Sequence, residues 1–353
     1  MDIRQAFKHL QKGPLHGVYV CYGSESYLIR EFMAQLQAAC VEPGQAEFAV
    51  SKYDLKETAV QDVIEDAETL PFMVPTKIIL AEEALFLTGA KDTSKVEHDL
   101  DRLLAYLESP VEFTVLVLVV HADKLDERKK IVKNIKDKGA VISFQPLNER
   151  DLKQWMQNRA KQSQCELTEE AIDRLLQHCG PRLQTLATEI DKLSTYGGER
   201  GVIRDTHVME LVPRSSEENI FQLIERIVEQ KVEAALKLYD NLLNQKEEPI
   251  KILALMARQY RMMLQVKHLR KSGYSDQQIG SQIGAHPYAA KRAGEQAKRY
   301  SDAKLGHMLE EIARLDFEMK TGRANKTRAL ELLIIQISSQ TQRESASSSS
   351  SSF

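Results

Sequence analysis

The first turn in the chain that could bind a phosphate follows an apolar run and precedes a helical pattern. It reads Tyr22-Gly-Ser-Glu-Ser-Tyr-Leu28. A phosphate-binding P-loop has the pattern G-x-x-x-x-G-K-[ST], in which glycines let backbone amides face the phosphates and the lysine reaches them. The second glycine and the lysine are missing here, and Glu25 puts a carboxylate where a phosphate would lie. We therefore interpret this turn as a degenerate P-loop that does not bind nucleotide, formed by Gly23, Ser24, Glu25 and Ser26.

The second half of a nucleotide site would be a strand followed by paired carboxylates that hold Mg²⁺. Val117–Val120 is such a strand, but His121-Ala-Asp123 follows it without a second acid. Asp126 and Glu127 lie nearby among several basic residues, and we interpret them as the solvated start of a helix with acids in its first turn. Both halves of the site thus fail, which indicates a nucleotide-type fold that no longer uses nucleotide.

Other catalytic and metal-binding patterns are missing from the sequence. It contains no G-x-S-x-G, H-E-x-x-H or G-x-G-x-x-G motif. The four cysteines form no C-x-x-C pair and have no histidine at zinc-finger spacing, so they are interpreted as free thiols. We predict no catalytic residue, no bound metal and no cofactor.

An unusual apolar segment, Ala67-Glu-Thr-Leu-Pro-Phe-Met-Val-Pro75, connects a short helix to a strand. Two prolines restrict its backbone. The large side chains between them have two interpretations: they pack onto their own domain, or they form an exposed, rigid anchor that enters a partner's pocket. Preset apolar anchors of the second kind dominate many interfaces. The residues concerned are Leu70, Pro71, Phe72 and Met73.

A second binding candidate resembles a helix–turn–helix. Ser275–Gly284 is followed by a segment in which Pro287 suits the first turn of another helix. That helix would carry a basic stripe, as a helix that enters the major groove of DNA requires. The same spacing also arises in ordinary helical bundles. The candidates for DNA contact are Lys291, Arg292, Lys298 and Arg299.

The elements that position these residues change type along the chain. Apolar runs alternate with helical patterns up to residue 145, which predicts a parallel sheet covered by helices. The run at 113–120 is nearly all β-branched, as expected for a strand buried on both faces. The other expected strands are 17–22, 47–53, 77–81 and 140–144, and the expected helices are 26–40, 59–67, 97–107 and 128–138.

After Pro146 we expect no further strands. Helices are predicted at 148–161, 168–180 and 182–196, with Asp205 as a cap candidate in 202–211, a linker at 213–216 and helices throughout 219–339. The fold class is therefore multidomain, α/β followed by all-α. The expected parts are an α/β domain (1–145), a small helical lid domain (146–213), a helical collar domain (214–340) and a disordered Ser-rich tail (341–353).

Composition narrows the class of protein further. A chain of 353 residues exceeds one ordinary domain, and a net charge of −3 argues against a polyanion bound over the whole surface. The apolar runs are shorter than the ~20 residues a membrane helix needs. The N-terminus has no apolar region typical of a secretory signal. We expect a soluble, cytoplasmic protein that does not contact a membrane.

The order of these features resembles the delta subunits of bacterial DNA polymerase III clamp loaders. Val18–Ile29 is similar to the family's G-x-[DE]-x-[YF]-L turn, and Ala67–Phe72 also matches. Leu315–Arg323 resembles the D-x-x-x-K-x-G signature, and Glu331–Ile334 follows it. Each motif is weak alone, but their order extends over about 320 residues.

The resemblance implies an AAA+-type fold without ATPase activity, in a subunit of the polymerase holoenzyme that has no catalytic activity of its own. The family's first domain binds the ring-shaped sliding clamp (beta), and an apolar plug favours the open ring for loading onto primed DNA. The matching positions are Leu70, Pro71, Phe72 and Met73, with Phe72 foremost; Pro71 departs from the adjacent Leu-Phe pair of some members. The collar would join the gamma/tau ATPase subunits and delta-prime.

Two other classes of function stay open. One is an AAA+ ATPase with an atypical nucleotide site, which the missing lysine and acids argue against. The other is a helix–turn–helix DNA-binding regulator that uses residues 273–299. Nucleotide binding would distinguish the first, and salt-dependent binding of duplex DNA the second.

Overall fold

The apolar run at 113–120 forms strand β4 (Thr114–Val120), in which every residue is buried. It is the middle strand of a five-stranded sheet with the order β2-β3-β4-β1-β5. All neighbouring strands pair in parallel. The sheet therefore has the form that the strand–helix alternation predicts. The other strands are β1 (Val18–Tyr22), β2 (Val50–Asp54), β3 (Lys77–Glu82) and β5 (Ala140–Ser143).

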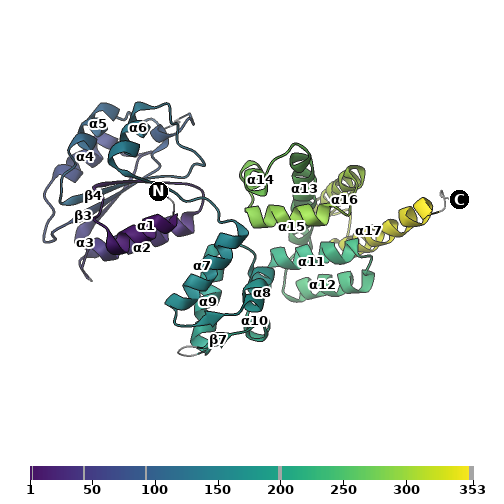
Figure 1. The fold of residues 1–353 in the computed structure, drawn as a ribbon. Coiled ribbons are helices and arrows are strands. Elements are labelled where there is room, and N and C mark those ends of the chain that lie inside the picture. Colours follow the sequence, from purple (N-terminus) through teal and green to yellow (C-terminus); the bar gives the residue numbers. More distant parts are fainter. Residues whose placement is uncertain (2, 43, 92–93, 198–200, 350–353) are drawn as a thin grey trace. The chain divides into compact units, whose positions relative to one another are not determined.

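Helices cover both faces of this sheet (Figure 1). On one face lie α1 (Ile3–Lys12) and α2 (Ser26–Cys40), where Phe32 contacts the rings of Phe7, Tyr19 and Phe144. On the other face lie α4 (Val60–Glu68), α5 (Leu100–Glu108) and α6 (Lys130–Lys138), whose apolar residues form one core with the sheet. Two short elements complete this part, α3 (Ala46–Ala49) and η1 (Leu85–Leu87).

The computed structural model describes residues 1, 3–42, 44–91, 94–197 and 201–349. The chain divides into two units, Met1–Pro146 and Leu147–Phe353. This division falls beside the boundary expected at 145/146. No helix among the described residues is both long enough and apolar enough to cross a membrane.

The second unit is almost entirely helical. Its first group of elements is α7 (Glu149–Gln162), β6 (Glu166–Leu167), α8 (Glu169–Cys179), α9 (Leu183–Gly197), β7 (Val202–Ile203) and α10 (Asp205–Leu211). Its second group is α11 (Ser216–Val228), α12 (Val232–Asn244), α13 (Pro249–Lys271), α14 (Asp276–Ile283), α15 (Pro287–Ala297), α16 (Asp302–Lys320) and α17 (Lys326–Ser349). Figure 1 shows the two groups, and the second has a core of its own from Ile220 to Ile337. The lid and collar boundaries stay predictions.

The structure differs from the sequence-based expectations at several places. Residues 46–49 form a helical turn, so β2 begins later than the expected 47–53. Strands do occur after Pro146, because β6 and β7 form a short parallel pair. Asp205 is the first residue of α10 rather than its cap; the backbone N–H of Arg204, just before it, donates to His207 Nδ1. Helix α17 extends to Ser349, into the tail expected to be disordered, and 350–353 lie outside the described residues.

Candidate functional site

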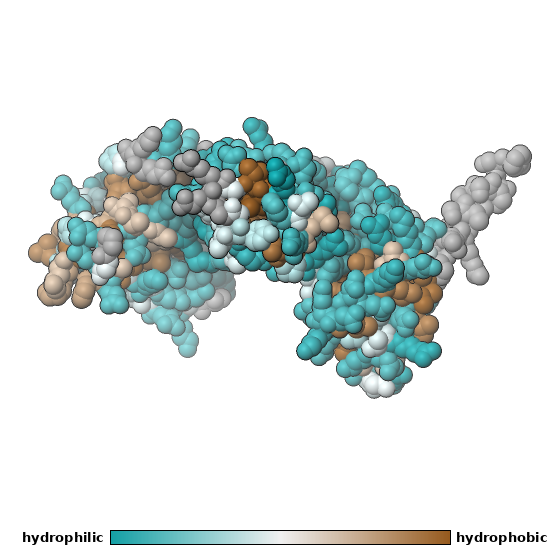
Figure 2. Space-filling model, turned by 90° about the horizontal axis from the view of Figure 1, so that it is seen from below, coloured by the Kyte–Doolittle hydropathy of each residue, from teal (hydrophilic) through white to brown (hydrophobic). Residues whose placement is uncertain are grey.

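The apolar segment between α4 and β3 lies at the surface of the first unit. Leu70, Phe72 and Met73 are 75%, 72% and 73% exposed, whereas the next residue, Val74, is buried. We call residues 70–73 the 70–73 loop. Figure 2 shows apolar surface at one end of this unit, beside a largely hydrophilic face. These side chains therefore do not pack onto their own domain, which excludes the first interpretation, and their entry into a partner's pocket stays a prediction.

The backbone of the 70–73 loop has little freedom to move. Helix α4 ends at Glu68, and the N–H of its C-cap residue Thr69 donates to Asp66 O at 3.0 Å. Pro71 and Pro75 fix their own φ angles and restrict the residue before each. Met73 adopts a left-handed conformation with φ of 59°. The loop is thus a short turn that holds three large apolar groups in water.

Backbone amides of the degenerate P-loop donate hydrogen bonds to carbonyl groups of the chain itself. The N–H of Gly23 donates to Val120 O at 3.3 Å, that of Glu25 to Phe144 O at 3.0 Å and that of Ser26 to Ser24 O at 3.1 Å. Gly23 has φ of 137°, and a Cβ there would lie 2.1 Å from Phe144 O. Burial raises the pKa of the Glu25 carboxyl at the start of α2. Amides bonded to carbonyl groups cannot also cradle a phosphate.

Two acidic residues after β4, Asp126 and Glu127, form ion pairs with basic residues close to them in the sequence. Asp126 accepts two hydrogen bonds of 2.9 Å from the Arg128 guanidinium, which lowers the pKa of Asp126 to about 2. Glu127 pairs with Lys136 at 2.7 Å. Both acids precede α6, which begins at Lys130, so the expectation that they lie in its first turn is wrong. The turn forms before the helix because Asp126 also accepts the Arg128 N–H.

The helix–turn–helix arrangement is present in α14 and α15, but its basic residues do not form an open stripe. Arg292 donates to Glu218 at 2.6 Å and lies 3.7 Å from the centre of the Phe221 ring. Lys291 pairs with Glu149, and Lys298 pairs with Glu295. Helix α15 ends at Ala297, so Lys298 and Arg299 lie past its last turn. The structure therefore does not bring the four candidates together on one helix face.

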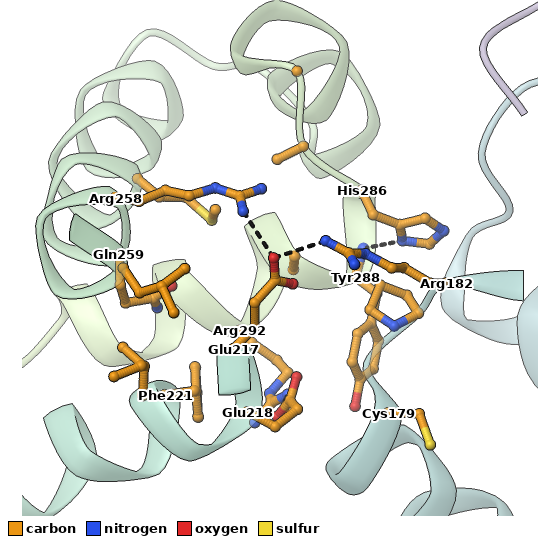
Figure 3. A pocket seen from close by; sticks show the side chains of 17 residues that line it. Cys179, Arg182, Glu217, Glu218, Phe221, Arg258, Gln259, His286, Tyr288 and Arg292 are labelled. Carbon is orange, nitrogen blue, oxygen red and sulfur yellow. Dashed lines mark hydrogen bonds and ion pairs between the residues drawn. The ribbon is translucent and has the colours of Figure 1, made fainter. Parts of the chain in front are cut away.

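A cavity of about 250 Å³ in the second unit gathers residues that the sequence patterns do not connect. Glu217 accepts hydrogen bonds from Arg182 at 2.7 Å and from Arg258 at 2.9 Å. Figure 3 shows both guanidinium groups directed at this carboxylate. The residues that line the cavity come from α8, the α8–α9 connection, α11, α13, the α14–α15 turn and α15. No sequence motif indicates the cavity, because its lining extends from Cys179 to Arg292, more than a hundred residues along the chain.

Comparison with known proteins places these features in a family. The family model described as "DNA polymerase III, delta subunit" matches residues 19–145, and the model of its C-terminal domain matches residues 217–337. DNA polymerase III subunit delta of Bacillus subtilis is 38% identical over 331 residues, which cover 94% of this chain and 95% of that protein. The chain belongs to the DNA polymerase III delta subunit family.

A solved structure and a more distant relative agree with this assignment to the delta family. The Bacillus subtilis DNA clamp loader delta protein matches with a TM-score of 0.83 and covers 96% of this chain and 99% of its own. A probable DNA polymerase III subunit delta of Aquifex aeolicus is 22% identical over 263 residues, 74% of each chain. The expected fold class, a parallel-sheet α/β part followed by helical parts, is thereby confirmed, and the delta family supports a role in clamp loading during DNA replication.

Proposed function

We propose that this chain acts as the delta subunit of a clamp loader and that its 70–73 loop binds the sliding clamp and favours the open ring. The observation that carries this proposal is the exposure of Leu70, Phe72 and Met73 on a turn whose backbone is restricted by Pro71 and Pro75. Fully burying one such side chain contributes about 1.5–3 kcal/mol relative to leaving it in water. A loop that is already ordered keeps more of this free energy as binding affinity.

Ring opening requires more than tight binding. A ligand shifts an equilibrium only through its different affinities for the two states. The 70–73 loop must therefore fit a pocket whose shape differs between the open and the closed clamp. We propose that Phe72 is the main anchor, since a large aromatic group in a well-packed pocket gives the largest loss on truncation.

The helical part of the chain is proposed to hold the other partners. We expect the collar to join the gamma/tau ATPase subunits and delta-prime, and primed DNA to bind mainly within the assembled complex. Two large apolar residues on neighbouring helices support an interface there, because Phe317 on α16 and Leu332 on α17 are exposed. The pairing of Arg292 and Lys291 with acids argues against the alternative of a DNA-binding regulator.

Truncation of the anchor tests the proposal. We expect Phe72→Ala to weaken binding of the sliding clamp from the same organism by roughly 2–4 kcal/mol, as for a buried aromatic anchor. Isothermal titration calorimetry with the full chain measures this. Phe317→Ala is the matched control, because it removes another exposed phenylalanine ring, from the other unit. An unchanged affinity for Phe72→Ala would show that Phe72 does not anchor the chain to the clamp.

Ring opening needs a separate readout on the clamp. A fluorophore and a quencher placed on the two sides of one clamp subunit interface report their separation. We expect the wild-type chain to relieve quenching and Phe72→Ala to do so only in proportion to its remaining binding. Saturating binding by the wild-type chain without relief of quenching would leave clamp binding intact and contradict the opening step.

A further inference from the structure

We propose that Lys77 is a positioning residue for the 70–73 loop, because its buried ammonium group ties together the two ends of the segment that carries it. The inference rests on the proposed function, since its effect is measured as clamp binding. Lys77 is the first residue of β3, and its side chain is 8% exposed. It contacts no clamp-facing group itself and acts through the loop.

The last turn of α4 is fixed by side chains from outside the helix. The final carbonyl groups of a helix have no partner within it. Here Thr69 Oγ1 donates to Glu65 O at 2.9 Å, Lys77 Nζ donates to Asp66 O, and Thr114 Oγ1 donates to Ala67 O at 2.7 Å. Three successive carbonyls are therefore held, and the point at which the 70–73 loop leaves the helix cannot fray.

Of these three donors, Lys77 is the one that carries a charge. Its Nζ also forms an ion pair with Asp66 Oδ1 at 3.0 Å, so one ammonium group binds both the backbone and the side chain of Asp66. The second carboxylate oxygen of Asp66 accepts a hydrogen bond from Tyr53 Oη at 3.0 Å. Removing an ammonium group from water is costly and is offset only by good geometry of this kind.

The same residue fixes the other end of the loop. The backbone N–H of Lys77 donates to Phe113 O at 2.9 Å, which joins it to the sheet. Its side chain contacts Asp66, eleven residues earlier in the sequence. The two ends of the segment between Asp66 and Lys77 are therefore held close together. Within that segment, the side chain of Val74 is buried and so also holds the loop to its own domain. The direction of the exposed side chains is therefore set by contacts that the clamp does not touch.

A purely structural role for Lys77 would change stability but not binding by the folded chain. A positioning role predicts a binding defect, because a released loop must lose conformational freedom when the clamp orders it. The two roles are separated by measuring affinity on protein shown to be folded.

The test is Lys77→Met in the full chain, which keeps an unbranched apolar stem and removes the ammonium group. We expect clamp affinity to fall about tenfold, the factor that corresponds to ordering one or two side chains at binding. Circular dichroism checks that the variant is folded. Lys138→Met is the matched control, because it breaks the Lys138–Glu108 ion pair between α6 and α5. We expect it to leave clamp affinity unchanged.

A double-mutant cycle with Phe72→Ala tests whether Lys77 affects clamp affinity through the 70–73 loop. If Lys77 acts through the loop, Phe72→Ala costs several-fold less affinity in the Lys77→Met chain than in the wild type, since coupled sites are not additive. Additive losses, or an unchanged affinity for folded Lys77→Met, overturn the inference. If Phe72→Ala has no effect in the wild-type chain, the proposed function itself fails.

A second variant covers the case in which Lys77→Met does not fold. Thr114→Val is similar in shape and removes only the hydrogen bond to Ala67 O. We expect a smaller loss of affinity in the same direction and the same non-additivity with Phe72→Ala. A folded Thr114→Val chain with wild-type affinity counts against the positioning of the loop by the end of α4.

Discussion

Met73 marks the point at which the 70–73 loop turns back to the domain. Its left-handed backbone costs about 1–2 kcal/mol for a residue other than glycine, and the next residue, Val74, enters the core. The apolar types of Leu70, Phe72 and Met73 are visible in the sequence, but their exposure is not. The same residues suit a core equally well, and a positive φ at methionine cannot be read from its type.

The interpretation of the Gly23 turn as a site that does not bind nucleotide stays a prediction. The missing lysine and second glycine indicate a site without nucleotide, and the amides of Gly23, Glu25 and Ser26 are bonded within the chain. We expect no ATP binding in calorimetric titration with Mg²⁺, while an ordinary P-loop ATPase in the same buffer serves as the positive control. Micromolar affinity of this chain for ATP would contradict the prediction.

The boundaries of helices and strands were predictable where the local pattern and the tertiary partners agree. Helix α2 has the expected bounds, because Leu28, Phe32 and Leu36 recur on one buried face. Strand β2 does not begin where its alternating pattern does. Val50 lies opposite Ile78, one residue after β3 begins, so most residues of α3 have no strand beside them. The start of β2 therefore depends on where the neighbouring strand β3 begins, which is a tertiary property.

The two glutamates in the first turn of α11 pair with Arg258 on α13, Arg292 on α15 and Arg182 in the α8–α9 connection. Glu218 is buried with a side chain 9% exposed, and Arg292 on α15 is its partner. The cap residue Ser215 is also tied to α8, because its N–H donates to His178 O at 2.8 Å. The expected linker at 213–216 is therefore bonded to its surroundings. Two adjacent glutamates give no sequence signal that one of them is buried.

Removal of Arg292 tests the energetic role of this turn. Burial raises the pKa of Glu218, although Arg292 opposes the shift. The folded chain then binds more protons than the unfolded chain between the two pKa values, so this group lowers stability as pH rises through that window. We expect Arg292→Ala to cost about 3 kcal/mol at pH 7, the lower end for breaking a buried pair, and less at pH 4.

Urea unfolding at the two pH values measures this difference. Glu218→Gln in the Arg292→Ala chain should recover part of the loss at pH 7, because the unpaired charge is then absent. Lys320→Ala breaks a more exposed pair with Asp316 and should change stability by less than about 0.5 kcal/mol. An equal loss for Arg292→Ala at both pH values would show that the buried charge is not its cause.

The sequence pattern changes near Pro146, where the two units of the chain divide, while the three-domain division stays a prediction. The cavity in the second unit could not be predicted, since Arg182 lies in the α8–α9 connection while Glu217 and Arg258 come from α11 and α13. Packing of distant segments brings these side chains together, so the spacing of residues in the sequence does not predict the cavity.

Each unit has its own core, which leads to a prediction for the isolated first unit. The sheet and α4, α5 and α6 bury their apolar residues against each other without help from later residues. We expect residues 1–146 to fold alone and to bind the sliding clamp within a factor of about three of the full chain, a difference below 1 kcal/mol. Circular dichroism and calorimetry measure both properties. A folded fragment that does not bind would place part of the binding surface in the second unit.

The strand order has a consequence for synthesis of the chain on the ribosome. Strand β1 is made first, yet both of its neighbours, β4 and β5, come from residues 114–143. At about 5–20 residues per second, the apolar segment Val18–Tyr22 waits roughly 5–20 s before either neighbour exists. During that interval it is available to chaperones and to the same segment of other nascent chains, so slower translation before residue 114 would raise the risk of aggregation.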